Sequence, residues 1–82
     1  MSLILYTRHG CHLCEDFEQE LRRLQQEQPF DFAIRDVDAR PEWRAAYNDR
    51  VPLLLAGDVE IARYFLDPQA LRGYLTKHRM FP

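Results

Sequence analysis

Two short runs of uninterrupted apolar residues place the strongest limit on what this chain can fold into. They are Leu3–Tyr6 and Leu53–Ala56. A strand that is apolar at every position is buried on both faces, so it lies in the middle of a sheet that helices cover on both sides. We therefore expect two central strands, over Met1–Thr7 and Val51–Ala56.

Two further segments alternate between apolar and polar side chains, which is typical of strands at the edges of a sheet. They are Phe30–Val37 and Val59 to about Ala62. Gly57-Asp58 separates the second of these segments from the apolar strand before it and predicts a two-residue hairpin turn. The two strands that this turn joins are therefore expected to be antiparallel.

Three segments have the periodicity of amphipathic helices, with apolar residues every three or four positions. They are Cys11 to about Glu27, Pro41 to about Asn48, and Leu66–His78. Pro29 ends the first helix, because the residue before a proline avoids the helical conformation. Asp67 is a good N-cap for the last helix, and Pro68 is favoured in its first turn.

The resulting order is β-α-β-α-β-β-α, in a single α/β domain that spans residues 1–82. The first two strands are joined through a helix, so a right-handed crossover makes them parallel. With the apolar strands at the centre, the sequence predicts a four-stranded mixed sheet in the order 2-1-3-4, flanked by helices. A length of 82 residues suits one domain.

The two cysteines of the chain, Cys11 and Cys14, lie in the stretch "GCHLC" between the first strand and the first helix. Cys11 is at the helix N-terminus, where unpaired backbone N–H groups and the helix dipole stabilise a thiolate. Cys14 is one turn further and shares a helix face with Phe17 and Leu21, so we expect it to be more buried. This arrangement suits a dithiol reductase, in which the exposed sulfur attacks the substrate and the inner sulfur resolves the mixed disulfide.

Three interpretations of this pair are compatible with the residues. A catalytic redox pair is favoured by the spacing and by the strand–helix–strand context. A structural zinc site needs four ligands, and beyond the two cysteines only His9 or His12 is near. The third interpretation is a pair of inert buried thiols. Positive charge on Arg8 and His12 favours a Cys11 thiolate, whereas the carboxylates that follow in the helix oppose it.

The chain resembles the thioredoxin superfamily, and most of all the small glutaredoxin-like proteins with a Cys-His-Leu-Cys motif. The segments that carry the resemblance are "YTRHGCHLC", "DVDARPEW", Tyr47 and "RVPLLL". The resemblance implies a thioredoxin-like fold, with Cys11 as the nucleophile and Cys14 as the resolving thiol. It also implies a cis bond between Val51 and Pro52, opposite the cysteines. Without the resemblance, an ordinary trans bond is the better expectation.

The same resemblance implies residues that contact a substrate. Arg8 corresponds to the basic residue that glutaredoxins place near a carboxylate of glutathione, and Asp67 to the acidic residue for its amine. His12 is expected to tune Cys11, and the backbone of Val51-Pro52 to pair with a bound peptide or thiol. One departure concerns the Gly-Gly pair that receives glutathione in that family. Here the stretch is Arg63–Asp67, whose bulky side chains could block the tripeptide.

We therefore expect a thiol–disulfide oxidoreductase that serves cell redox homeostasis. The expected partners are a disulfide-containing protein or a glutathione mixed disulfide, together with a thiol reductant. We expect no tightly bound cofactor and no bound metal, and glutathione is the candidate co-substrate. Two alternatives stay open: a binding or redox-sensing module that docks partners through Val51, Trp43 and Tyr47, and a metal-binding cysteine pair.

Charge and cysteine content restrict the partners and the compartment. The net charge is −2 and the basic residues form no stripe, so no nucleic acid is expected as a partner. The apolar runs are far shorter than the roughly 20 residues that span a bilayer, and the N-terminus lacks the pattern of a signal peptide. Two cysteines are too few for a secreted disulfide scaffold, so we expect a cytoplasmic protein. We also expect a monomer that does not act at a membrane.

Overall fold

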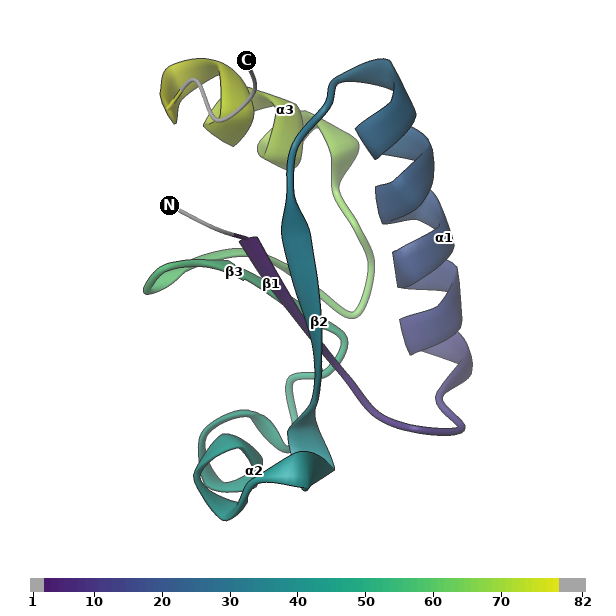
Figure 1. Ribbon diagram of the computed structural model, residues 1–82, viewed down its shortest axis with the longest axis vertical. Helices are drawn as coiled ribbons and strands as arrows, with labels where there is room; N and C mark the ends of the chain where they lie inside the picture. Colours follow the sequence, from purple (N-terminus) through teal and green to yellow (C-terminus); the bar gives the residue numbers. More distant parts are fainter. Residues whose placement is uncertain (1–2, 79–82) are drawn as a thin grey trace.

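A four-stranded mixed sheet forms the centre of the molecule in the computed structural model, which describes residues 3–78 (Figure 1). Its strands are β1 (Leu3–Thr7), β2 (Phe32–Asp36), β3 (Leu53–Ala56) and β4 (Val59–Arg63). They lie in the order β2-β1-β3-β4. Strand β1 is parallel to β2 and antiparallel to β3, and β4 is antiparallel to β3. The predicted order, directions and central strands are confirmed.

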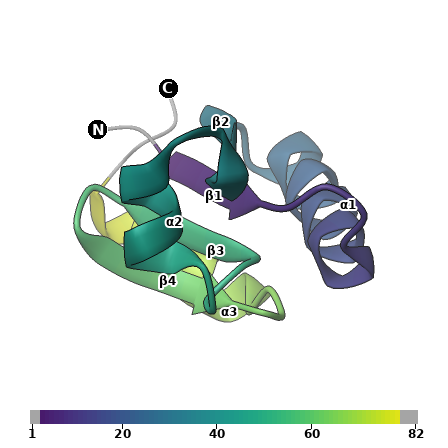
Figure 2. The ribbon, with the colours of Figure 1, turned by 90° about the horizontal axis from the view of Figure 1, so that it is seen from below.

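Three α-helices flank the sheet, as expected. They are α1 (His12–Glu27), α2 (Pro41–Tyr47) and α3 (Pro68–His78). Helices α1 and α3 pack against one face, and α2 packs against the other face, where Trp43 and Tyr47 meet Tyr6 (Figures 1 and 2). The sheet is therefore covered on both sides, which is why its two central strands are apolar except for Thr7 at the end of β1.

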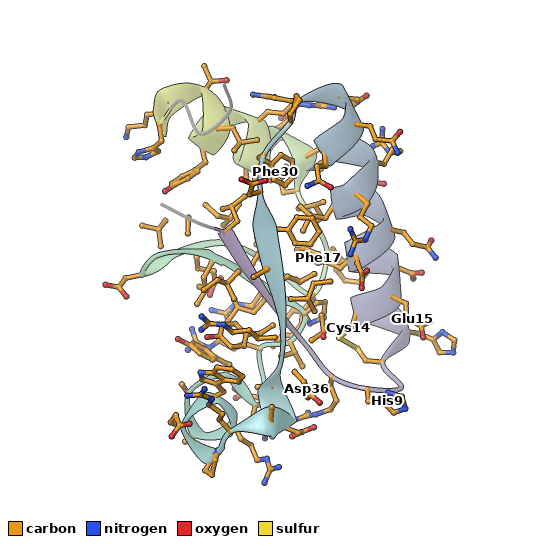
Figure 3. The ribbon with its side chains drawn as sticks, viewed as in Figure 1. His9, Cys14, Glu15, Phe17, Phe30 and Asp36 are labelled. Atoms are coloured by element: carbon orange, nitrogen blue, oxygen red, sulfur yellow. A yellow bond between two sulfur atoms is a disulfide. The ribbon has the colours of Figure 1, made fainter. Side chains whose placement is uncertain are left out.

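The alternation of side chains along β1 and β3 divides the core into two clusters. Leu5 and Leu54 point to the side of α1 and α3, where they join a large cluster with Phe17 and Leu21. The larger cluster contains the buried residues Leu3, Leu5, Phe17, Leu21, Leu24, Phe30, Leu54, Ala56, Ala62, Leu71 and Leu75. A smaller cluster on the side of α2 contains Tyr6, Leu53 and Leu55. Phe17 is labelled between helix α1 and the sheet in Figure 3.

The turn between β3 and β4 is the predicted Gly57-Asp58 hairpin. Gly57 has a φ of 61°, a left-handed conformation that glycine adopts without a steric penalty. The register between the two strands shifts at Leu54/Leu55. Strand β4 is an edge strand, and its side chains are mostly exposed, with Ala62 buried.

Several boundaries differ from those expected. Strand β2 ends at Asp36 because the Asp36 side chain accepts a hydrogen bond from the backbone N–H of Asp38, 2.9 Å away. The strand expected over Phe30–Val37 therefore spans only Phe32–Asp36, and a short 3₁₀ helix, η1 (Val37–Ala39), follows it. Strand β3 begins at Leu53, after the Val51-Pro52 pair, and residues 1–2 of the first expected strand lie outside the described residues.

Candidate functional site

The cysteine loop connects the end of β1 to the start of α1. Gly10 turns the chain with a φ of 73°, in the left-handed region. Cys11 then adopts an extended conformation and is the N-cap of α1. The backbone N–H of Cys14 donates a hydrogen bond to the Sγ atom of Cys11 over 3.1 Å. The sulfur of Cys11 therefore occupies the place of a capping oxygen, where negative charge is favoured.

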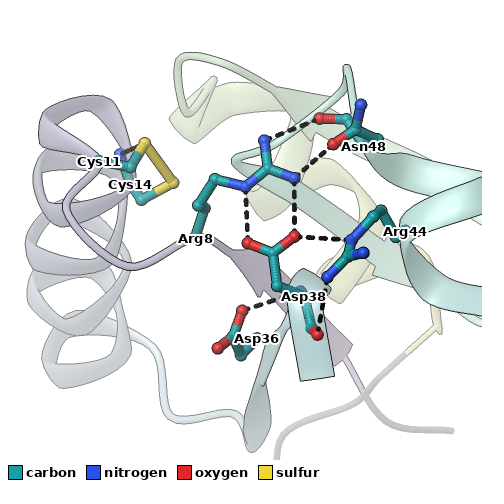
Figure 4. A network of polar contacts seen from close by, with 7 residues as sticks. All are labelled: Arg8, Cys11, Cys14, Asp36, Asp38, Arg44 and Asn48. Carbon is teal, nitrogen blue, oxygen red and sulfur yellow. Dashed lines mark hydrogen bonds and ion pairs between the residues drawn. A yellow bond between two sulfur atoms is a disulfide. The ribbon is translucent and has the colours of Figure 1, made fainter. Parts of the chain in front are cut away.

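The two sulfurs form a disulfide, with the Cα atoms 5.2 Å apart (Figures 3 and 4). Cys14 is only 3% exposed, whereas Cys11 is partly exposed. The predicted difference in burial is confirmed. An incoming disulfide can reach Cys11 more readily than Cys14, because Cys14 lies one helical turn further in.

A hollow of about 280 Å³ opens beside the loop and reaches Cys14. It is lined by Thr7, Arg8, His9, Gly10, Cys14, Glu15, Glu18 and Asp36. Figure 3 shows His9, Cys14, Glu15 and Asp36 at the same end of the molecule. The inner sulfur is therefore adjacent to a polar space, although its own exposed area is small.

Arg8 is the centre of a polar network next to the cysteines (Figure 4). Its Nε and Nη2 atoms donate to the carboxylate of Asp38 over 2.9 and 3.1 Å. Nη1 donates to the backbone carbonyl of Asn48 over 3.3 Å, and Nη2 also donates to the Asn48 side chain. Arg44 donates to the same Asp38 carboxylate over 3.1 Å. Most donors of the predicted anion-binding residue are thus engaged within the protein.

These contacts change the acidity of both partners. The hydrogen bond from Arg8, reinforced by the one from Arg44, holds the pKa of Asp38 below its usual range. The same bond raises the pKa of Arg8. Sequence reasoning missed this network, because Asp38 and Asn48 are 30 and 40 residues from Arg8.

The other predicted contact residues lie in different environments. The side chain of His12 is 97% exposed, and its Nδ1 atom is 3.7 Å from the Glu15 carboxylate. The bond between Val51 and Pro52 is cis, as the resemblance implies. Pro52 is buried, and Val51 packs against the cluster of Tyr6, Leu53 and Leu55. Their roles toward a substrate stay predictions.

Asp67 has the capping role that the sequence predicts. Its Oδ1 atom accepts hydrogen bonds from the backbone N–H groups of Gln69 and Ala70, over 3.0 and 3.3 Å. These bonds satisfy two of the unpaired amides at the start of α3. Asp67 is exposed at this position. Its contact with a substrate amine stays a prediction.

The segment Arg63–Asp67 is shaped by Tyr64, which has a φ of 68°. The Tyr64 N–H donates to the carbonyl of Pro52 over 2.8 Å, and its hydroxyl donates to the carbonyl of Asp49 over 2.6 Å. A second cavity, of about 210 Å³, lies between this segment and α1. The sequence indicated bulky side chains here but not the cavity that they enclose.

Within residues 3–78, no three histidine, cysteine or carboxylate side chains are grouped so that they could hold a metal ion. No helix in that range has the length and apolar character needed to cross a membrane.

Known proteins from several bacteria are similar to this chain in sequence or in fold. A solved structure of protein Ne2328 from Nitrosomonas europaea is 40% identical, with a TM-score of 0.78 over 89% of this chain and 88% of that chain. An uncharacterized protein of Mycobacterium tuberculosis is 32% identical over 89% of this chain and 80% of its own length. NrdH-redoxin from Escherichia coli, a glutaredoxin-like protein with a thioredoxin-like activity profile, is 28% identical. Its TM-score is 0.57, over 88% of this chain and 93% of that chain.

Sequence and structure agree on the family. Residues 2–76 match the family described as the glutaredoxin-like domain (DUF836). This range contains both cysteines, the cis Val51-Pro52 bond and all four strands. The chain therefore belongs to the glutaredoxin-like domain family and has a thioredoxin-like fold.

Proposed function

We propose that this protein is a thiol–disulfide oxidoreductase that works through the Cys11/Cys14 pair. The observation that carries the proposal is the asymmetry of the two sulfurs. Cys11 is partly exposed and caps α1, whereas Cys14 is buried one turn away and within bonding distance. The thioredoxin-like activity profile of the related NrdH-redoxin supports the same chemistry.

The reaction begins with the dithiol form. The Cys11 thiolate attacks one sulfur of a substrate disulfide, forming a mixed disulfide and releasing the other sulfur as a thiolate that takes up a proton. Cys14 then loses its proton and attacks the Sγ atom of Cys11, which releases the second substrate thiol. The substrate gains two electrons and two protons, and the protein is left with the Cys11–Cys14 disulfide.

A thiol reductant completes the cycle. Two equivalents of the reductant restore the dithiol and are themselves oxidised to a disulfide. Glutathione is one candidate, and its carboxylate and amine would meet Arg8 and Asp67. The backbone of Val51-Pro52 is the candidate pairing partner for the substrate, and His12 the candidate modulator of Cys11. Such turnover in the cytoplasm contributes to cell redox homeostasis.

The experiment compares two substrates and three proteins. Reduction of a protein disulfide and of a glutathione mixed disulfide is measured for wild type, Cys11→Ser and Cys14→Ser, with excess reductant. We expect turnover by wild type, none by Cys11→Ser, and an accumulated mixed disulfide on Cys11 in Cys14→Ser, seen by mass spectrometry. Inactivity of the wild type on both substrates, or full activity of Cys11→Ser, overturns the proposal. Retained activity of Cys14→Ser on the glutathione substrate alone indicates a monothiol route.

A further inference from the structure

A groove beside the cysteine loop has features that the reaction chemistry does not require. It is the 210 Å³ cavity between α1 and the segment that precedes α3, which we name the Phe65 groove. Its lining consists of Leu13, Asp16, Phe17, Glu20, Tyr64, Phe65 and Leu66. The floor is apolar, and two carboxylates lie on the side of α1.

The groove begins within the cysteine motif itself. Leu13 lies between Cys11 and Cys14 in the sequence, and the other lining residues of α1 follow it at three, four and seven positions, on one helix face. With a rise of about 1.5 Å per residue, this face extends roughly 10 Å away from the disulfide. That length matches about three residues of an extended polypeptide.

The apolar wall is exposed and held in place. Phe65 is 72% exposed and Leu13 is 39% exposed, so neither side chain is needed to fill the core. Tyr64 is fixed by its hydrogen bonds to the carbonyls of Pro52 and Asp49. Adjoining exposed apolar side chains on a small monomer mark a surface that contacts another molecule.

The charge of the groove identifies the occupant. Glu20 is paired with Arg23. The side chain of Asp16, by contrast, makes no hydrogen bond or ion pair with any residue in the described range 3–78. An unpaired carboxylate beside an apolar wall favours a peptide that carries an apolar side chain and, close to it, a positively charged one. Glutathione has two carboxylates and one ammonium group, so its net negative charge disfavours it as the occupant of this groove.

We infer that the Phe65 groove docks the polypeptide around the half-cystine of a protein substrate, selecting a large apolar residue on one side and Lys or Arg on the other. This inference rests on the proposed function and names its substrate class. It assigns Phe65 and Leu13 to contact with the apolar residue and Asp16 to the basic one. The reacting disulfide would then lie at the Cys11 end of the groove.

The test uses three short peptides, each a symmetric disulfide-linked dimer, so that attack on either sulfur is equivalent. The half-cystine is flanked by Leu and Lys, by Leu and Glu, or by Gly and Lys. The second-order rate of reduction by the dithiol protein is measured for each and divided by the rate for hydroxyethyl disulfide. We expect the Leu/Lys peptide to react fastest, about threefold to fivefold faster than Leu/Glu and about tenfold faster than Gly/Lys.

Two groove variants and one matched control make the assignment specific. Asp16→Asn should remove the advantage of Lys over Glu, and Phe65→Ser should remove the advantage of Leu over Gly. Asp58→Asn, an equal change of charge in the hairpin turn, should leave both advantages intact. Equal rates for all three peptides, or advantages that persist in both groove variants, overturn the inference.

A binding measurement separates this inference from the proposed function. The Leu/Lys peptide with Ser in place of its cysteine is added to the oxidised protein, and NMR shifts are followed. Shifts at Leu13 and Phe65 without reduction of any disulfide support the groove and overturn the proposed function. Disulfide reduction that needs Cys11, with no such shifts and no peptide preference, overturns the groove and supports the proposed function.

Discussion

The chemistry of the two cysteines follows from their individual environments. In the dithiol protein, iodoacetamide should modify Cys11 about ten times faster than Cys14, because Cys14 is 3% exposed and Cys11 lies partly exposed at a helix N-terminus. Peptide mapping by mass spectrometry after a short pulse gives the two rates. Equal modification of both cysteines in a protein that stays folded would contradict the assigned roles.

Asp38 provides a second prediction for a single residue. Replacing Arg8 by alanine should raise the pKa of Asp38 toward its ordinary value, and Arg44→Ala should raise it less, because Arg8 supplies the larger effect. A lowered pKa in the folded state means that this pairing contributes stability above the ordinary Asp pKa. That contribution is lost as the pH falls through the lowered value. An NMR titration of the Asp38 carboxyl carbon measures its pKa in the wild type and in both variants. An unchanged pKa in Arg8→Ala would contradict the prediction.

Residue environments could be predicted from the sequence where they depend on near neighbours. The capping position of Cys11 and the burial of Cys14 are local consequences of one helix and were predicted correctly. The partners of Arg8 and of the Tyr64 hydroxyl were not, because those pairs are 30, 40 and 15 residues apart. The cis Val51-Pro52 bond was reached through family resemblance, since the residues alone favour the trans form.

At the scale of elements, the start of α3 gives a measurable quantity. Asp67→Ala should lower the free energy of unfolding by about 1 kcal/mol, because two backbone N–H groups lose their acceptor. Asp67→Asn retains an oxygen for these bonds and serves as the control. Urea unfolding of the three proteins gives the values. A wild-type stability for Asp67→Ala would show that the cap contributes nothing.

Element order was predictable because apolar patterning reports burial directly. Uninterrupted apolar runs predicted the two central strands, and alternating runs predicted the edges. Element boundaries were less predictable, because side chains set them. Asp36 ends β2 by accepting the Asp38 amide, and η1 follows. On α2, Trp43 and Tyr47 pack against the sheet, whereas Ala46 is exposed.

At the scale of the whole molecule, the exposed residues of the functional surface lie outside the buried core. The larger cluster joins α1, α3 and the sheet, and Leu54 is fully buried within it. The Phe65 groove shares Phe17 with this cluster, but Leu13 and Phe65 on its walls are exposed and lie outside the cluster. This separation allows substrate selection to change through surface residues while the fold that positions Cys11 is kept.

This separation predicts that two substitutions affect stability very differently. Leu54→Ala should lower the free energy of unfolding by about 2–5 kcal/mol, because it leaves a cavity in the larger cluster. That is a large part of the roughly 5–15 kcal/mol typical of a domain. Phe65→Ser should change stability by less than about 0.5 kcal/mol, since its side chain is mostly in solvent. Urea unfolding measures both free energies, provided that the m-values are unchanged. A loss of peptide selectivity in a Phe65→Ser protein of wild-type stability then reports docking. If Phe65→Ser unfolds as readily as Leu54→Ala, Phe65 belongs to the core, and the groove loses its assignment as a recognition surface.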